Sequence, residues 1–102
     1  MNLEAWCTWF KRRGAGRLRR TLMRRWDPIG VAGAPSARDE YDSYVGSVAE
    51  RLRRDASVEE ITDYLESVRT QRMGLPRNRN SDLRAASVLK GWYAGEMARA
   101  RR

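Results

Sequence analysis

Apolar residues recur every three or four positions along most of the chain, which is the spacing of one buried face of an α-helix. In the first segment this stripe consists of Leu3, Cys7, Phe10, Gly14, Leu18, Leu22 and Trp26. Gly14 and Gly16 interrupt it, and a glycine inside a helix costs about 1 kcal/mol relative to alanine. The pattern therefore predicts either two short helices, near 2–13 and 17–26, or one helix that is weakened in its middle.

A connector rich in glycine and proline, residues 27–36, separates this segment from the next predicted helix. Ser36 is a candidate N-cap with Asp39 as its approximate capping-box partner, so the helix is predicted to begin there and to end near Asp55. Its apolar face consists of Tyr41, Tyr44, Val45, Val48, Ala49 and Leu52.

The clearest helix start in the chain is the capping box Ser57-Val58-Glu59-Glu60, in which the serine hydroxyl accepts a hydrogen bond from the last amide. Apolar residues follow at helical spacing, and Gly74 is well placed to end this helix. A last helix is predicted to run to about residue 99 from an N-cap at Asn80 or Ser81. Its buried residues are expected to be Leu83, Ala86, Leu89, Trp92, Tyr93 and Met97.

No segment alternates between apolar and polar residues, so no strand is expected. The sequence predicts an all-α fold, a small bundle of four helices or of four with an extra short N-terminal helix. Its 102 residues are enough for a single core. We expect residues 1–16 to form a basic, aromatic N-terminal extension and residues 17–102 to form a single helical-bundle domain.

Composition excludes several classes of functional site. The chain has no histidine and one cysteine, Cys7, so it cannot form the usual zinc ligand sets, a disulfide framework, or a Ser-His or Cys-His catalytic pair. No run of about 18 apolar residues is present, and none is therefore expected to span a membrane. We expect a cytoplasmic protein that is not an enzyme, with no catalytic residues, no cofactor and no metal site.

Charge is distributed unevenly along the chain, whose net charge is +8. Residues 1–26 hold eight cations against one acid, residues 27–68 hold four cations against ten acids, and residues 69–102 hold nine cations against two acids. Of the cations only Lys11 and Lys90 are lysine, and a GC-rich genome produces the same arginine excess. The sequence leaves open whether that excess is functional or compositional. The distribution predicts that basic ends pack beside an acidic middle.

Two acidic clusters form the first candidate interaction surface. Its members are Asp39, Glu40, Asp42, Glu59, Asp63 and Glu66. The first three lie at a helix start, where carboxylates interact favourably with the positive end of the helix dipole. They also fit a divalent-metal site. The last three fit either a solvated helix face or a docking surface for something basic, including the chain's own ends.

Basic residues form the second candidate surface, which would contact an anion or a nucleic acid. Its members are Lys11, Arg12, Arg13, Arg17, Arg20, Arg24, Arg77 and Arg79. In segment 3–25 aromatic residues lie on one face of the predicted helix and cations on the other. This pattern also suits an anionic membrane surface or an ordinary bundle helix. In the segment Arg77–Ser81 two guanidinium groups precede the free amides of a helix N-terminus, which is a plausible anion site as well as an ordinary solvated loop.

Four short motifs follow one another in the middle of the chain. They are Trp26-Asp27-Pro28-Ile29-Gly30-Val31, Asp39-Glu40-Tyr41-Asp42-Ser43-Tyr44, Ala56-Ser57-Val58-Glu59-Glu60-Ile61 with Tyr64-Leu65, and Arg72-Met73-Gly74-Leu75. Together they resemble a family of small uncharacterised bacterial helical proteins with a W-[DN]-P-[IL]-G turn, a D-E-Y-D-x-Y helix start and a terminal M-G-L. The resemblance covers roughly residues 18–76 and implies a compact helical fold. That family is a domain of unknown function, so it implies no activity.

These observations lead to one main functional hypothesis and two alternatives. The main hypothesis is a small, non-enzymatic protein-interaction module, an adaptor or an immunity-like inhibitor with an unknown protein partner, acting through the acidic surface or the loop at 27–35. The first alternative is electrostatic binding of nucleic acid, without sequence reading, through the arginine-rich N-terminal helix. The second is attachment of that helix to an anionic membrane surface. The sequence leaves the oligomeric state open.

Overall fold

Helices account for nearly all of the chain that the structure describes. The computed structural model describes the backbone of residues 1–26 and 35–100, and the side chains of residues 1–26 and 42–100. The helical elements are α1 (Leu3–Trp9), a π-helical segment (Phe10–Gly14), α2 (Ala15–Arg25), α3 (Pro35–Arg53), α4 (Val58–Ser67), a second π-helical segment (Val68–Arg72) and α5 (Arg79–Ala100). No strand occurs in these ranges, which confirms the predicted all-α fold.

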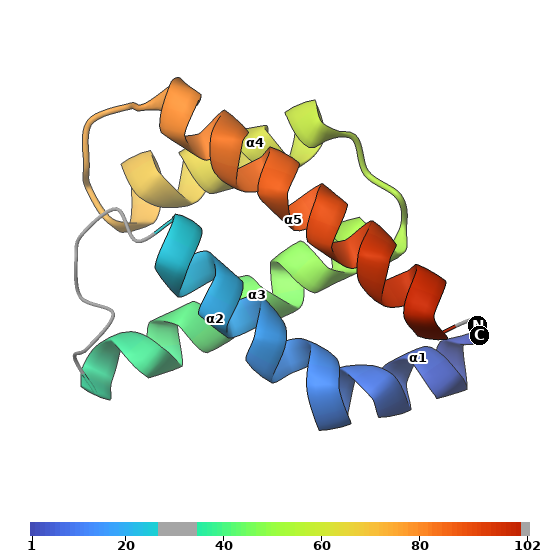
Figure 1. Ribbon diagram of the computed structural model, residues 1–102. Helices are drawn as coiled ribbons and strands as arrows, with labels where there is room; N and C mark the ends of the chain where they lie inside the picture. Colours follow the sequence, from blue (N-terminus) through green and yellow to red (C-terminus); the bar gives the residue numbers. More distant parts are fainter. Residues whose placement is uncertain (27–34, 101–102) are drawn as a thin grey trace.

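The first three elements form one continuous N-terminal helix rather than two separate ones. It changes direction at the π-helical segment (Figure 1). Gly14 is buried there, and a Cβ atom at this position would lie 2.7 Å from two ring atoms of Trp9. Gly14 therefore lets the indole lie against the helix, so the residue predicted to weaken the helix also serves its packing. The predicted domain boundary between residues 16 and 17 lies inside this continuous helix.

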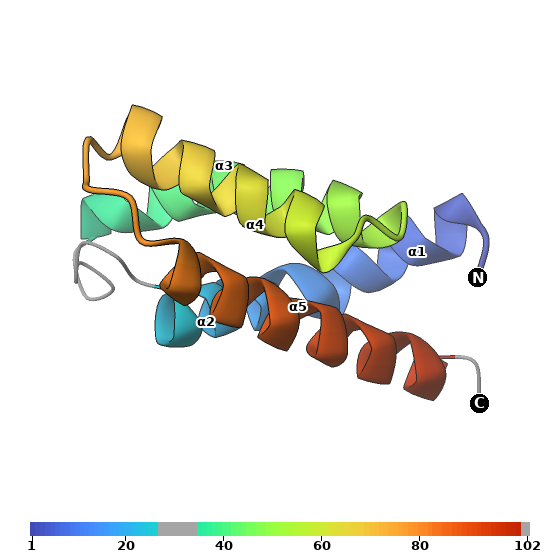
Figure 2. The ribbon, with the colours of Figure 1, turned by 90° about the horizontal axis from the view of Figure 1, so that it is seen from above.

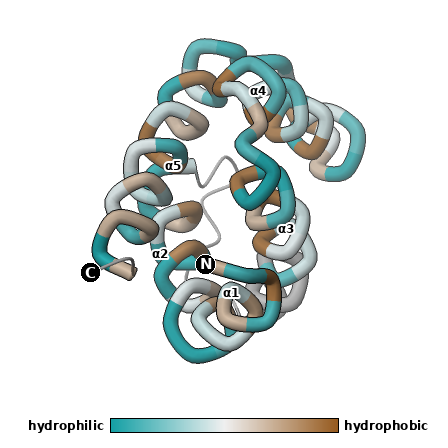
Figure 3. Tube along the Cα trace, turned by 90° about the vertical axis from the view of Figure 1, so that its right-hand side faces the viewer, coloured by the Kyte–Doolittle hydropathy of each residue, from teal (hydrophilic) through white to brown (hydrophobic). Residues whose placement is uncertain are grey.

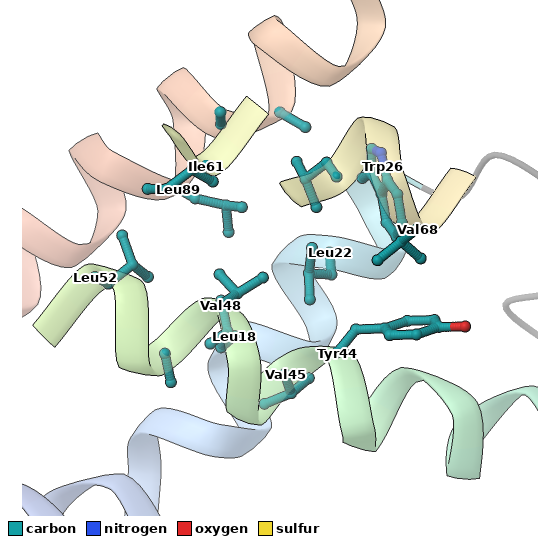
Figure 4. Packing of buried hydrophobic residues seen from close by; sticks show 14 of the residues in the cluster. Leu18, Leu22, Trp26, Tyr44, Val45, Val48, Leu52, Ile61, Val68 and Leu89 are labelled. Atoms are coloured by element: carbon teal, nitrogen blue, oxygen red, sulfur yellow. The ribbon is translucent and has the colours of Figure 1, made fainter. Parts of the chain in front are cut away.

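The four helices surround one hydrophobic core. Helix α5 packs against α4 and α2, and α3 packs against α2 and, less extensively, against α4 (Figures 1 and 2). Hydrophobic residues of α2 and α3 lie on the sides that face each other (Figure 3). The largest core side chains that are fully buried are Leu18, Leu22, Trp26, Val48, Ile61, Leu65, Val68 and Leu89 (Figure 4). Trp6 and Phe10, from the predicted extension, are half-buried against the same core.

Local signals set most of the helix ends. The Ser57 hydroxyl accepts a hydrogen bond of 3.1 Å from the Glu60 amide, as predicted. Gly74 has a φ of +65°, the left-handed conformation that favours glycine after a helix. Helix α3 begins at Pro35, one residue before the predicted N-cap Ser36, and the side chains of residues 36 and 39 lie outside the described part of the chain.

The predicted start and buried face of the last helix are partly wrong. Asn78, not Asn80 or Ser81, caps α5, because its side-chain oxygen accepts a hydrogen bond of 3.2 Å from the Ser81 amide. Leu83 was expected in the core but is 40% exposed, whereas Asp82 is fully buried. The sequence pattern placed Leu83 in the core, but the structure buries the neighbouring Asp82 instead. Its charge pairing, described below, allows this carboxylate to be buried.

Candidate functional site

The acidic candidate surface is largely occupied by the chain's own arginines. Asp42 lies 2.6 Å from the Arg19 guanidinium of α2. Asp63 and Glu66, on α4, both accept from Arg79, at 2.9 and 2.6 Å. Arg77 also pairs with Glu66.

The remaining acidic candidates are not engaged in the same way. Glu59 is exposed. It has no ion pair within the described part of the chain. The side chains of Asp39 and Glu40 lie outside the described residues, so the structure does not test that cluster. Three of the four described acidic candidates therefore face the protein's own cations.

The loop before α5 is neutralised in the same way. Its two guanidinium groups, Arg77 and Arg79, hold the α4 carboxylates, and Asn78 accepts from an amide of the first turn. The hydrogen bonds that Arg79 donates to Asp63 and Glu66 raise its pKa above the usual value. The ion pairs of this loop connect α4 to the start of α5, which fits a structural role better than a site for an external anion.

Two cations of the N-terminal helix tie it to its neighbours. Arg17 donates to both oxygens of Glu96 on α5, at 3.0 and 2.8 Å, and the Glu96 side chain is only 5% exposed. Arg19 holds Asp42 on α3. Arg17 was predicted to contact an external anion, but in the structure its guanidinium group is engaged on a buried carboxylate.

Seven other cations are exposed and form no ion pair with any residue that the structure describes. We call them the unpaired cations: Lys11, Arg12, Arg13, Arg20, Arg24, Arg25 and Arg84. Every other lysine or arginine with a described side chain has a carboxylate or an aromatic ring beside it. The rings belong to Tyr64, 4.1 Å from Arg51, and Tyr44, 5.9 Å from Arg72. The unpaired cations thus differ from the other described cations in having no carboxylate or aromatic partner among the side chains that the structure describes.

Three of the unpaired cations form a row on the outer side of the N-terminal helix. Arg20 and Arg24 each follow a fully buried leucine by two positions, so they point away from the core. Arg13 precedes Arg20 by seven residues, about two helical turns, and lies on the same side. At a rise of about 1.5 Å per residue this outer row, Arg13, Arg20 and Arg24, spans about 16 Å.

A second helix adds a cation to this region. Arg84 of α5 lines a shallow groove between α2 and α5 together with Arg24 and Arg25. The same groove contains Leu83 and Val88, which are 40% and 38% exposed. The predicted contact residues include neither Arg25 nor Arg84. Nothing in the sequence links Arg84 to the N-terminal helix, because only the packing of α5 on α2 brings them together.

The aromatic residues of the N-terminal helix pack toward α5 instead of lying among the cations. The Trp6 indole donates a hydrogen bond of 2.8 Å to the Tyr93 hydroxyl, and its ring stacks on Phe10 with centroids 5.0 Å apart. Trp9 lies beside Trp92 with ring centroids 6.4 Å apart. The aromatic face of the pattern that suited a membrane surface is therefore part of the bundle's own packing.

The sequence did not reveal a buried ion pair that lies between the second π-helical segment and α5. Asp82 accepts from the Arg69 guanidinium at 2.8 Å and from the Trp26 indole at 2.7 Å. The Asp82 side chain is fully buried, and that of Arg69 is 7% exposed. All three groups satisfy one another, so this cluster fits a structural role.

The described residues contain neither a metal-binding cluster nor a membrane-spanning helix. No three His, Cys, Asp or Glu side chains among them come together in a group that could hold a metal ion. None of the described helices is both long and apolar enough to cross a lipid bilayer.

Comparisons with known proteins return no match: no family model fits the chain, and no curated protein or solved structure is significantly similar to it. The resemblance of residues 18–76 to a family of unknown function therefore stays a prediction.

Proposed function

We propose that this protein is a non-enzymatic module that binds the phosphate backbone of nucleic acid through its unpaired cations. The observation that carries the proposal is the division of the cations into two sets. The other arginines with described side chains have a carboxylate or an aromatic ring beside them. The seven unpaired cations, on the N-terminal helix and α5, have neither among the described residues. Repeated, exposed positive charge without internal neutralisation is the electrostatic pattern that binds phosphates.

The acidic surface supports a protein partner less well. Asp42, Asp63 and Glu66 already hold arginines of the same chain, so a basic partner would have to displace them. The outer row also lacks the apolar centre that protein interfaces usually have, because it consists of arginine alone. Phosphate contacts require only cations.

A membrane surface is also less well supported. A helix that lies on a bilayer inserts its apolar face among the lipids. In this protein Trp6, Trp9 and Phe10 are half-buried against α5 and the core. Inserting them would break the Trp6–Tyr93 hydrogen bond.

The test is the affinity for a labelled DNA duplex of random sequence, measured by fluorescence anisotropy at two salt concentrations. If four of the unpaired cations contact phosphates, the logarithm of the binding constant falls with a slope of about −3.6 against the logarithm of salt. Affinity then drops about 150-fold between about 50 and about 200 mM salt. Absence of binding at the lower concentration would refute the proposal.

A matched pair of variants assigns the binding surface. The combined change Arg13→Gln, Arg20→Gln and Arg24→Gln should weaken binding at least about tenfold. The control removes the same charge from paired cations, Arg53→Gln, Arg54→Gln and Lys90→Gln, which hold Glu50 and Asp55. It should bind almost as tightly as the wild type. Equal losses in both variants would mean that net charge, not this surface, determines binding.

The groove between α2 and α5 favours a second candidate function, an interaction with an acidic amphipathic protein segment. Exposed Leu83 and Val88 beside Arg84 offer apolar contact and positive charge together. A partner that binds there would be lost from a Leu83→Gln, Val88→Gln variant and retained by Glu59→Gln, Asp63→Asn. The opposite result would assign the partner to the acidic surface.

A further inference from the structure

The unpaired cations come from a rigid surface made by two helices, and this geometry bears on which form of nucleic acid fits. The outer row lies on α2, which is held on one side by Arg19–Asp42 to α3 and on the other by Arg17–Glu96 to α5. Arg84 on α5 widens the row across the groove between the two helices. The unpaired cations are therefore carried by two packed helices and are spread over an area, not along a flexible tail.

We propose that this surface takes double-helical nucleic acid in preference to single strands. The inference rests on the proposed function and adds the form of the ligand. A duplex presents phosphates on two strands at regular positions. The major groove of B-form DNA is about 12 Å wide and the minor groove of an A-form RNA duplex is wide and shallow, so a row of about 16 Å can reach phosphates on both sides of such a groove. A single strand has no fixed shape and must be ordered to contact cations on both helices at once.

Stacking of bases on aromatic side chains usually offsets the entropic cost of ordering a single strand, and no described side chain of this kind lies among the unpaired cations. Proteins that bind single strands combine cations with exposed aromatic side chains on which bases stack. None of the unpaired cations lies over the ring of a described aromatic side chain. Trp6 and Trp9 of the same helix are turned to Tyr93 and Trp92. Single strands would thus meet the charges without the stacking.

The higher charge density of a duplex also favours its binding over that of a single strand. A duplex carries one phosphate for about every 1.7 Å of its axis. For the same number of contacts, the dependence of binding on salt is steeper for a duplex, about −0.9 per contact, than for a single strand, about −0.7. More counterions are released from the duplex, so the entropic gain at low salt is larger.

The experiment compares three labelled ligands by anisotropy with the intact chain at about 50 mM salt: a DNA duplex of about 24 base pairs, oligo-dT of the same length, and a duplex RNA of the same length. Both duplexes should bind about tenfold or more tighter than oligo-dT, and oligo-dT should not quench the tryptophan fluorescence. Equal or tighter binding of oligo-dT, or quenching by it, would overturn the preference while leaving the proposed function standing. Failure of every ligand would instead refute the proposed function.

Two further arms separate the shape of the ligand from its charge. Arg84→Gln should lower affinity for the duplex by a larger factor than affinity for oligo-dT, because a duplex on the outer row spans both helices and contacts Arg84 in the same complex. Equal factors would contradict the two-helix surface. Dextran sulfate and vesicles of anionic phosphatidylglycerol, matched in charge concentration, should compete less well than the duplex. Competition by either one that equals the duplex would overturn the preference for a double helix.

Discussion

Two regions of this molecule contain arginines in contrasting surroundings. On the α4–α5 side Arg69, Arg77 and Arg79 each hold a carboxylate, and Arg69 does so inside the core. On the outer side of the N-terminal helix Arg13, Arg20 and Arg24 hold none among the described residues. The net charge of a protein therefore says little about its partners until the cations used internally have been set apart. Here one set stabilises the fold and the other remains available for a ligand.

The largest effect that separates the two regions should come from the buried pair. Changing Asp82→Asn leaves the Arg69 guanidinium buried without a counter-charge and should lower the free energy of unfolding by about 3–5 kcal/mol. Urea unfolding followed by circular dichroism measures the loss. Arg69→Met combined with Asp82→Leu should recover part of it, because removing both charges leaves no uncompensated ion. A loss below about 1 kcal/mol for Asp82→Asn would contradict the internal role of this arginine.

A smaller effect is expected where the pair lies at the edge of the core. Glu96 is nearly buried, but its partner Arg17 is 41% exposed on its side chain, so water screens part of the interaction. Glu96→Gln should lower the free energy of unfolding by about 1–2 kcal/mol in the same assay. A loss as large as that of Asp82→Asn would mean that partial exposure does not weaken the pair.

The outer row should contribute almost nothing to stability. Replacing Arg13, Arg20 and Arg24 with glutamine breaks no ion pair of the described chain, so the free energy of unfolding should stay within about 0.5 kcal/mol of the wild type. A small gain is also compatible, since the change removes repulsion between like charges. Chemical denaturation checks this, and a loss of about 2 kcal/mol would show that these arginines support the fold.

The smallest effect concerns pH. The hydrogen bond from Arg53 lowers the pKa of Glu50 below its ordinary value of 4.5. A carboxyl group with a lowered pKa in the folded state stabilises the protein above its unfolded pKa and loses that contribution as pH falls through the folded value. The melting temperature of wild type should therefore decline slightly more than that of Glu50→Gln below about pH 4.5. Parallel declines would show that this exposed pair has no measurable role, and Glu59→Gln serves as the control.

Much of the fold could be predicted from local sequence signals. Apolar spacing predicted four helices because each helix must bury a continuous stripe, and the Ser57 cap and Gly74 stop depend only on residues beside them. The choice between one continuous N-terminal helix and two separate ones could not be made from the sequence, because it involves the contact of Gly14 with the ring of Trp9. Residue spacing alone does not show which side of Gly14 a ring will cover.

Residues that act across helices could not be identified in this way. Asp82 and Arg69 lie 13 positions apart on different helices, and each taken alone resembles a solvated surface residue. The sequence predicted that basic ends pack beside the acidic middle. It left open whether the acidic candidates would face a partner or those ends, because a sequence does not show which cation will pack beside a given carboxylate. Arg84 was missed for the related reason that its position beside Arg24 depends on the packing of α5 against α2.

The central claim is that an arginine with neither a carboxylate nor an aromatic ring beside it binds phosphate, whereas one that holds an internal carboxylate does not. The direct measurement is the salt dependence of duplex binding for single variants. Arg20→Gln should reduce the steepness of the logarithmic plot by about one unit, because one phosphate contact is lost. Arg79→Gln, whose guanidinium holds Asp63 and Glu66, should leave the steepness unchanged. Equal reductions in the two variants, or an unchanged slope for Arg20→Gln, would contradict the account.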